Sequence, residues 1–193
     1  MNGLFQAALE VEQFMRQQNW RFCLIGGLAV VRWGQPRATQ DLDFSLLTGF
    51  GREQEYVDRL LTRFSSRRAD ARDFALRHRV VLARTAEGVS LDIALAAFPF
   101  EEKVIERSST FSFAEGVTLT TASAEDLIVL KAFAGREQDW FDVRGIIARQ
   151  GNGLDWNYII PELTLLNQLK EGSDLLQHLE TIRQDVKSRD KKQ

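Results

Sequence analysis

The chain has 193 residues, of which 44% are hydrophobic and 27% charged, and its formal net charge is −2. This near-neutral balance excludes a protein whose whole surface is basic for nucleic-acid binding. The single cysteine, Cys23, excludes a disulfide framework and a cysteine-rich zinc site. No apolar run is long enough to span a bilayer or to act as a secretory signal, so we expect a cytoplasmic protein with one core.

The first part of the chain alternates between helical and extended patterns. Leu4, Ala8, Val11 and Met15 recur at helical spacing and predict an amphipathic first helix. The expected elements in chain order are a helix over 3–18, a strand over 21–25, a helix over 26–33, a strand over 41–46, a helix over 51–64, strands over 74–83 and 89–94, a helix over 99–107, and strands over 111–113 and 117–120. This alternation predicts an α+β fold, a mixed sheet flanked by helices.

From Ser123 onward the pattern becomes helical, and Ser123 itself fits an N-cap position. The expected helices cover 123–133, about 137–149, and a segment from about 173. Asp155 could cap an intervening helix, which Pro161 should split or kink. We therefore predict a catalytic core over 1–121 and a helical region over 122–193 that packs on it.

A glycine pair, Gly26-Gly27, joins the first expected strand to the helix that follows. Backbone N–H groups at the start of a helix bind phosphate, because they are unpaired and the helix dipole favours negative charge there. Glycine lets a ligand approach this backbone closely. The pair therefore indicates a phosphate-binding turn, with a plain tight turn as the alternative.

Two carboxylates, Asp41 and Asp43, open the next expected strand. Residues i and i+2 of a strand share a face, so Asp41 and Asp43 should lie side by side while Leu42 turns toward the core. Two like charges at this spacing need a cation, and a hard divalent ion that carries a nucleoside triphosphate meets the need. Two surface aspartates at a strand end are the alternative.

The glycine pair followed by the two aspartates resembles the signature of the DNA polymerase β-like nucleotidyltransferase superfamily. Within it, the AbiEii-type nucleotidyltransferases of abortive-infection and toxin–antitoxin systems carry a string similar to Arg37-Ala38-Thr39-Gln40-Asp41-Leu42-Asp43-Phe44. The resemblance covers about residues 20–145. It implies a nucleotidyltransferase fold and the transfer of NMP from an NTP to an acceptor, with release of pyrophosphate.

The resemblance also implies roles for individual residues. Asp41 and Asp43 would ligate two Mg²⁺ ions, with Mn²⁺ as an alternative metal, and Gly26 and Gly27 would bind phosphate. Two residues of the loop that enters the metal strand complete the set. Arg37 suits bidentate contact with phosphate, and Thr39 could orient Asp41 or a phosphate oxygen. The alternative for both is an exposed loop.

The implied mechanism requires a third carboxylate on a neighbouring strand, and Asp92 answers that description. It is a single acid in an apolar segment, and a buried carboxylate needs a partner such as a shared metal. The resemblance implies that Asp92 ligates the catalytic metal and accepts the proton of the attacking hydroxyl. Two alternatives stay open: Glu87 is a competing acid in a predicted turn, and Asp92 could pair with a nearby arginine.

The helical half carries a further charged set that resembles the family's lysine and D-x-x-D segment. The resemblance implies that Lys131 and Arg136 contact the nucleotide, and that Asp139 and Asp142 line the rim of the active site. The two aspartates are three residues apart and share a helical face. From the residues alone, Lys131 could instead snorkel to the surface, and the aspartates could simply pair with Arg136 and Arg144.

These features predict a metal-dependent nucleotidyltransferase that uses an NTP substrate. The acceptor hydroxyl would belong to an RNA 3′ end or to a protein, and the arginine-rich stretch from 63 to 84 would serve RNA unless it is a solvated surface. An aminoglycoside-like small molecule is the alternative acceptor, and a non-catalytic nucleotide-binding or interaction module is the alternative function. The resemblance also implies an antitoxin partner, and we expect no membrane association.

Overall fold

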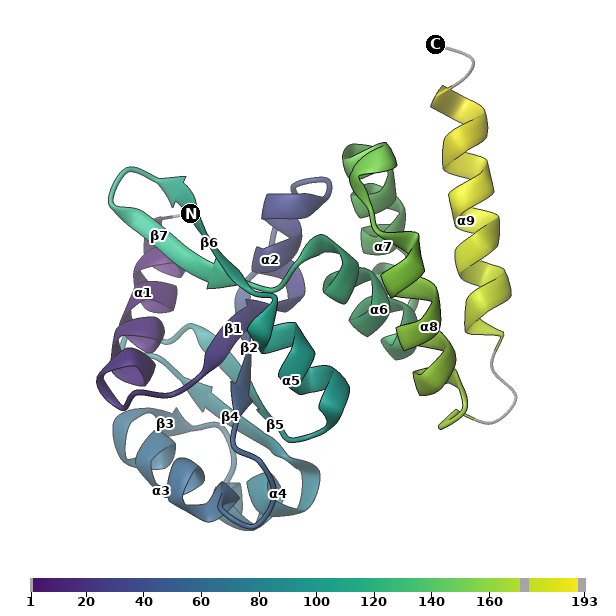
Figure 1. Ribbon diagram of the computed structural model, residues 1–193. Coiled ribbons are helices and arrows are strands. Elements are labelled where there is room, and N and C mark those ends of the chain that lie inside the picture. The colour runs from purple at the N-terminus through teal and green to yellow at the C-terminus, as the bar shows by residue number, and fades with distance from the viewer. Residues whose placement is uncertain (1, 171–173, 191–193) are drawn as a thin grey trace. The chain divides into compact units, whose positions relative to one another are not determined.

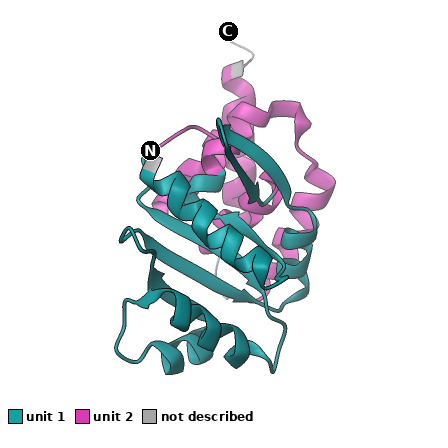
Figure 2. Ribbon diagram, turned by 90° about the vertical axis from the view of Figure 1, so that its left-hand side faces the viewer, with its two compact units in different colours: residues 1–29, 38–122 teal, residues 30–37, 123–193 magenta. Residues whose placement is uncertain are grey.

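The computed structural model describes residues 2–170 and 174–190, and it contains two compact units (Figure 2). The first unit comprises residues 1–29 and 38–122, and the second comprises residues 30–37 and 123–193. The segment 30–37 therefore groups with the helical part of the chain, although it precedes the first acid of the predicted site. The assignment of a catalytic core to 1–121 and of a helical region to 122–193 stays a prediction.

Within the described residues, seven strands of the first unit form one mixed sheet. Their spatial order is β3 (Ser65–Ser66), β4 (Val80–Arg84), β5 (Ser90–Ala96), β2 (Asp41–Leu47), β1 (Phe22–Ile25), β7 (Val117–Thr121) and β6 (Ser109–Ala114) (Figure 1). The pairs β2–β5 and β1–β7 are parallel, and the other pairs are antiparallel. The predicted α+β class with a mixed sheet is confirmed.

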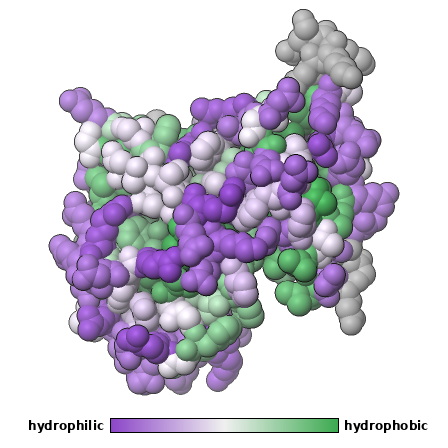
Figure 3. Space-filling model, in the orientation of Figure 1, coloured by the Kyte–Doolittle hydropathy of each residue, from purple (hydrophilic) through white to green (hydrophobic). Residues whose placement is uncertain are grey.

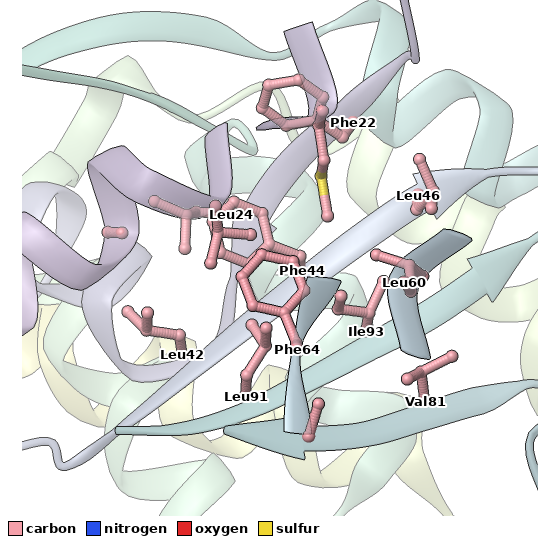
Figure 4. Close-up of a cluster of buried hydrophobic side chains, with 14 of the residues drawn as sticks. Phe22, Leu24, Leu42, Phe44, Leu46, Leu60, Phe64, Val81, Leu91 and Ile93 are labelled. Carbon is pink, nitrogen blue, oxygen red and sulfur yellow. The ribbon is translucent and has the colours of Figure 1, made fainter. Parts of the chain in front are cut away.

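The main hydrophobic core of the first unit lies on one face of this sheet. It is covered by α1 (Asn2–Gln17), α3 (Glu53–Arg63) and α4 (Ala71–His78). Alternate residues of β2 and β5 point into this core, among them Phe44 and Ile93, both of which are fully buried (Figure 4). Each such side chain contributes about 2 kcal/mol by leaving water. Because strands alternate with a period of two, the residues between them face the other side of the sheet.

The opposite face carries α5 (Pro99–Glu106), which packs on β2 through the buried side chains of Phe100, Val104 and Ile105. Directly after β1 the chain enters α2 (Gly26–Trp33), so strand and helix meet without an intervening loop. The predicted glycine turn is therefore part of the helix, and Gly26 is the first helical residue. This arrangement brings the start of α2 to the face of the sheet that the core does not use.

The predicted strand over 74–83 is wrong in its first half. Residues Ala71–His78 form α4, Arg79 follows at a positive φ of 54°, and the strand begins only at Val80. Tertiary contacts override the local alternation of apolar residues here. Ala75 is fully buried in the core, and Arg72 donates two hydrogen bonds to Asp58 of α3, at 2.7 and 3.0 Å. These contacts hold the segment on α3 as a helix.

The second unit is helical. Its helices in the described residues are α6 (Ala124–Ala134), α7 (Glu137–Gln150), α8 (Trp156–Asn167) and α9 (Leu175–Asp190), with a short 3₁₀ turn, η1 (Gly151–Gly153). The predicted caps are present: Ser123 Oγ accepts from the N–H of Asp126 at 3.1 Å, and Asp155 Oδ1 accepts from Asn157 at 3.0 Å. Residue 173, where the last helix was expected to start, lies outside the described residues.

Pro161 does not split its helix, so the predicted split is wrong, and the alternative of a kink stays a prediction. Helix α8 runs continuously from Trp156 to Asn167 with Pro161 inside it. Proline removes one backbone hydrogen bond near the start of the helix. The neighbouring turns are held by burial of Ile159 and Leu163, both at 0% exposure, which outweighs that loss. In the part of the chain that the structure describes, no helix combines the length and the apolar character needed to cross a membrane.

Candidate functional site

The predicted metal ligands lie on one face of the sheet. Strands β2 and β5 run parallel, with Asp43 opposite Asp92 and Asp41 opposite Ser90. Residues opposite one another in paired strands project to the same side, and the strands lie about 4.8 Å apart. The three acids therefore share the face that is turned away from the main core. Asp41 is exposed, whereas Asp43 and Asp92 are half-buried.

These acids do not form a closed ligand cage. Within residues 2–170 and 174–190, no three histidine, cysteine, aspartate or glutamate side chains come together as a ready-made metal site. The chemistry of the set still suits a hard cation, because it offers carboxylate oxygens on adjacent strands. The metal-ligand role of Asp41, Asp43 and Asp92 stays a prediction.

Gly26 lies directly against the carboxylate of Asp43. A β-carbon at position 26 would be 2.0 Å from Oδ2 and 2.5 Å from Cγ of Asp43. The backbone of Gly26 also has a positive φ of 66°, which glycine adopts most easily. Both constraints require glycine at the start of α2, and Gly27 follows as a buried residue of the first turn. The turn thus brings the helix start to one of the predicted metal ligands.

Thr39 is placed to orient Asp41. Its hydroxyl Oγ1 donates to Asp41 Oδ1 at 2.9 Å. A hydrogen bond to one carboxylate oxygen limits rotation of the group and leaves the other oxygen for a cation or for water. This geometry supports the predicted orienting role of Thr39, which itself stays a prediction.

The sequence left the arginine partner of Asp92 unidentified, and the structure shows it to be Arg67. The guanidinium Nη2 of Arg67 donates to Asp92 Oδ1. Burial raises the pKa of Asp92 above its usual value; the charge and hydrogen bond of Arg67 oppose this shift, and the negative charge of Asp41 adds to it. The sequence gives no signal that singles out Arg67, because it is one of several arginines in the same stretch.

A second group of predicted residues forms a buried charge cluster in the helical unit. Nζ of Lys131 lies 3.1 Å from Asp139 Oδ1 and 2.8 Å from Asp142 Oδ2. The side chains are 8%, 2% and 1% exposed, respectively. The amine is held inside between two carboxylates, so the alternative of a lysine that snorkels to the surface is wrong. A buried ammonium needs such partners to offset its lost hydration.

Two arginines extend this cluster to the surface of the same unit. Arg37 donates to Asp142 through Nε at 2.8 Å and through Nη2 at 3.0 Å. Arg136 donates to Asp139 through Nε at 2.6 Å and through Nη2 at 3.2 Å. The alternative pairing of the aspartates with Arg136 is thus present for Asp139. Arg144 instead pairs with Asp185 at 3.3 Å.

The cluster keeps its carboxylates ionised. Burial alone would raise the pKa of Asp139 and of Asp142, but the hydrogen bonds and charges of the surrounding cations outweigh it. For Asp139 these cations are Arg136 and Lys131, and for Asp142 they are Arg37 and Lys131. Both pKa values therefore lie below the usual range of an aspartate.

Comparison with known proteins assigns the chain to a family. The sequence profile described as "Nucleotidyl transferase AbiEii toxin, Type IV TA system" matches residues 16–164. The chain belongs to the AbiEii nucleotidyltransferase family. The matched region of this AbiEii protein contains the glycine turn, the three acids of the sheet and the Lys131 cluster. No match was found among curated proteins.

A solved structure shows the fold of this AbiEii protein independently. An antigenic nucleotidyltransferase-like protein from Paracoccidioides brasiliensis superposes with a TM-score of 0.55 at 16% identity, over 92% of each chain. The lincosamide antibiotic adenylyltransferase LnuA, with lincomycin bound, gives a TM-score of 0.46 at 14% identity, over 73% of this chain and 94% of its own. The likeness to the Paracoccidioides protein, at 16% identity, concerns the fold alone, and with it the predicted nucleotidyltransferase fold is confirmed.

The arginine-rich stretch of this AbiEii protein is largely neutralised by acids of its own unit. The face drawn in Figure 3 is covered mainly by hydrophilic residues. The ion pairs of the stretch are Arg63 with Glu10, Arg67 with Asp92, Arg68 with Asp70, Arg72 with Asp58 and Arg79 with Glu53. Paired arginines attract phosphate less strongly than unpaired ones, which favours the alternative of a solvated surface.

Proposed function

We propose that this AbiEii nucleotidyltransferase transfers NMP from an NTP to an acceptor hydroxyl in a metal-dependent reaction that releases pyrophosphate. The observation that carries this proposal is the register of β2 on β5. It sets Asp43 opposite Asp92, with Asp41 on the same face and the backbone of Gly26 against Asp43. Acids and a helix start meet at one place on the sheet, as binding of a metal–nucleotide complex requires.

The donor set supports two divalent cations, Mg²⁺ or Mn²⁺. Carboxylate oxygens are the ligands that these ions prefer, and Asp41, Asp43 and Asp92 supply them from two neighbouring strands. When bound, the ions would polarise the α-phosphate, lower the pKa of the acceptor hydroxyl and stabilise the leaving pyrophosphate. The cations would also relieve the repulsion among the three acids.

We propose that residues of the first unit also bind the phosphates, orient Asp41 and accept a proton. Gly26 and Gly27 would present backbone N–H groups to the phosphates of the nucleotide. Thr39 would hold Asp41 in one orientation through the 2.9 Å hydrogen bond to Oδ1. Asp92 would accept the proton of the attacking hydroxyl.

Nucleotide binding by Arg37, Lys131 and Arg136 stays part of the proposal. In the second unit these cations are already paired with Asp139 and Asp142. A triphosphate would therefore have to share or replace those carboxylates. The 77% exposed side chain of Arg136 is the part of the cluster best able to reach a ligand.

For the acceptor we propose an RNA 3′ end or a protein hydroxyl. The family description names a toxin of a toxin–antitoxin system. We therefore propose that nucleotidyl transfer by this chain inhibits growth and that an antitoxin counteracts it. Induction of the wild-type chain should stop growth, whereas an Asp41→Ala/Asp43→Ala variant expressed at the same level should not. Equal inhibition by both proteins would show that toxicity does not arise from transfer.

A transfer assay tests the proposed reaction. The chain is incubated with each of the four α-phosphate-labelled NTPs and Mg²⁺ or Mn²⁺, in the presence of total RNA, protein or aminoglycosides. Label should appear in RNA or protein and should be lost in the Asp41→Ala/Asp43→Ala variant. An Asp70→Ala/Asp73→Ala variant is the matched control, because it removes two exposed acids of the same unit.

Each outcome of this assay is informative. Label in the aminoglycoside alone would replace the proposed acceptor by a small molecule. Metal-dependent NTP binding without label in any acceptor would favour a non-catalytic nucleotide-binding module. Absence of both binding and transfer would overturn the proposed function.

A further inference from the structure

Arg67 occupies a position that neither the family pattern nor the predicted site includes. Its backbone N–H donates to the carbonyl of Leu82 on β4 at 3.0 Å, which continues the pairing of β3 with β4. Leu82 lies opposite Asp92 in the β4–β5 ladder. Strand β4 therefore lies between the backbone of Arg67 and that of Asp92, and the side chain of Arg67 reaches across β4 to the carboxylate.

We propose that Arg67 competes with the divalent cation for Asp92 and thereby sets the affinity of the carboxylate set for metal. This inference rests on the proposed function, since it takes Asp92 as a metal ligand. It makes Arg67 a positioning residue: without metal its guanidinium holds Asp92 beside Asp43, and metal binding releases it.

Arg67 holds Asp92 through fewer hydrogen bonds than neighbouring arginines use to hold their carboxylates. Only Nη2 of Arg67 donates to Asp92, and Nε is a buried donor that has no hydrogen-bond partner among the described residues. Two neighbouring arginines behave differently. Arg68 and Arg72 each use both Nε and Nη2 on one carboxylate, at 2.7 to 3.0 Å. A guanidinium with an unmet buried donor is held less firmly than one in a bidentate pair.

Charge explains why the exchange should be coupled to metal. Asp92 faces two further acids, and Asp43 is its direct neighbour in the β2–β5 register. Without a cation these groups repel one another, and Arg67 supplies the positive charge that reduces the repulsion. A divalent ion at Asp92 would repel the guanidinium, whichever carboxylate oxygen it binds. Because the charge of Arg67 opposes a cation at Asp92 in the wild type, its apparent metal affinity is lowered.

The test is Mn²⁺ binding by the full chain in the absence of nucleotide, read from the electron paramagnetic resonance signal of free Mn²⁺. Arg67→Gln should bind Mn²⁺ more tightly, on the order of fivefold, since a partly exposed ion pair no longer competes. Arg67→Lys keeps the charge and should return the affinity toward that of the wild type. Arg72→Gln removes the same charge from a bidentate pair with Asp58 and should leave it unchanged at physiological salt.

Thermal unfolding with and without Mn²⁺ provides a second readout. Mn²⁺ should raise the Tm of Arg67→Gln more than that of the wild type, because a tighter ligand stabilises the folded state more. Arg67→Met replaces Arg67→Gln if the latter does not fold. Equal or weaker Mn²⁺ binding by the folded variants would overturn the inference.

The same data separate this inference from the proposed function. Wild type that binds Mn²⁺, loses binding in Asp41→Ala/Asp43→Ala and is indifferent to Arg67→Gln would retain the metal site and refute only the role of Arg67. Wild type that binds no Mn²⁺ at all would overturn both.

Discussion

Gly26 has no room for a side chain, because a β-carbon at this position would lie 2.0 Å from Oδ2 of Asp43. The helix start and the predicted metal ligand are therefore one structural unit. A substitution at either residue should displace the other, so a substitution at Gly26 tests the geometry of the site directly.

Gly26→Ala should destabilise the first unit and abolish transfer. The backbone at φ +66° disfavours alanine, and the new methyl group would displace Asp43. Together these effects should cost about 3 kcal/mol. Gly116→Ala is the control, since Gly116 has a φ of +71° with nothing within 4 Å. It should cost roughly 1 kcal/mol in urea unfolding and leave transfer intact. Similar losses in both variants would show that Asp43 does not constrain position 26.

Thr39→Val should lower kcat/KM for transfer about tenfold with little change in stability, because it removes one hydrogen bond to a charged group. The bond in question is the 2.9 Å contact from Thr39 Oγ1 to Asp41 Oδ1. Thr39→Ser keeps the hydroxyl and should retain most of the activity. Wild-type kinetics in Thr39→Val would mean that Asp41 is oriented by other groups.

Lys131→Met should lower the free energy of unfolding of the helical unit by about 3 kcal/mol, since it leaves two buried carboxylates with less positive charge. Asp139 and Asp142 keep Arg136 and Arg37, respectively, so the loss should not be larger. Denaturant unfolding measures the change. Lys187→Met, at an exposed position of α9, is the matched control and should have no measurable effect. Unchanged stability in Lys131→Met would contradict a structural role for the cluster.

Acid should destabilise the helical unit through Asp139 and Asp142. Both pKa values are depressed in the folded state, so the carboxylates contribute stability above the unfolded value of about 3.9. That contribution is lost as the pH falls through the lower, folded pKa values. Unfolding measured from about pH 6 to about pH 1.5 should show this loss, and Asp142→Asn should weaken it. An identical loss of stability at low pH in the wild type and in Asp142→Asn would show that Asp142 does not cause the acid sensitivity.

Much of the sheet could be predicted from the sequence because a strand repeats every two residues. The alternation of Asp41, Leu42, Asp43 and Phe44 is sufficient to send acids and apolar residues to opposite faces. The pairing of β2 with β5 requires tertiary information, since register depends on packing across the sheet. For that reason Asp92 could be chosen as the third acid, but not placed opposite Asp43.

Other features depend on contacts that leave no local trace. Residues 71–78 form a helix because Ala75 is buried in the core and Arg72 is hydrogen-bonded to Asp58 of α3. Lys131 is buried because two aspartates from the next helix surround its amine. Arg67 is the arginine that reaches Asp92 because β3 pairs with β4, and nothing in the sequence distinguishes it from its neighbours. Each of these outcomes follows from distant partners rather than from local pattern.

The most direct measurement compares NTP labelled on the α-phosphate with NTP labelled on the γ-phosphate, using wild type and Asp43→Asn. Nucleotidyl transfer places the α label on the acceptor and releases the γ label as pyrophosphate, and it should require a divalent cation and Asp43. Asp70→Asn should behave as wild type, because Asp70 pairs with Arg68 at the surface. Transfer of the γ label to the acceptor, or α transfer that survives in Asp43→Asn, would contradict the proposed site and its chemistry.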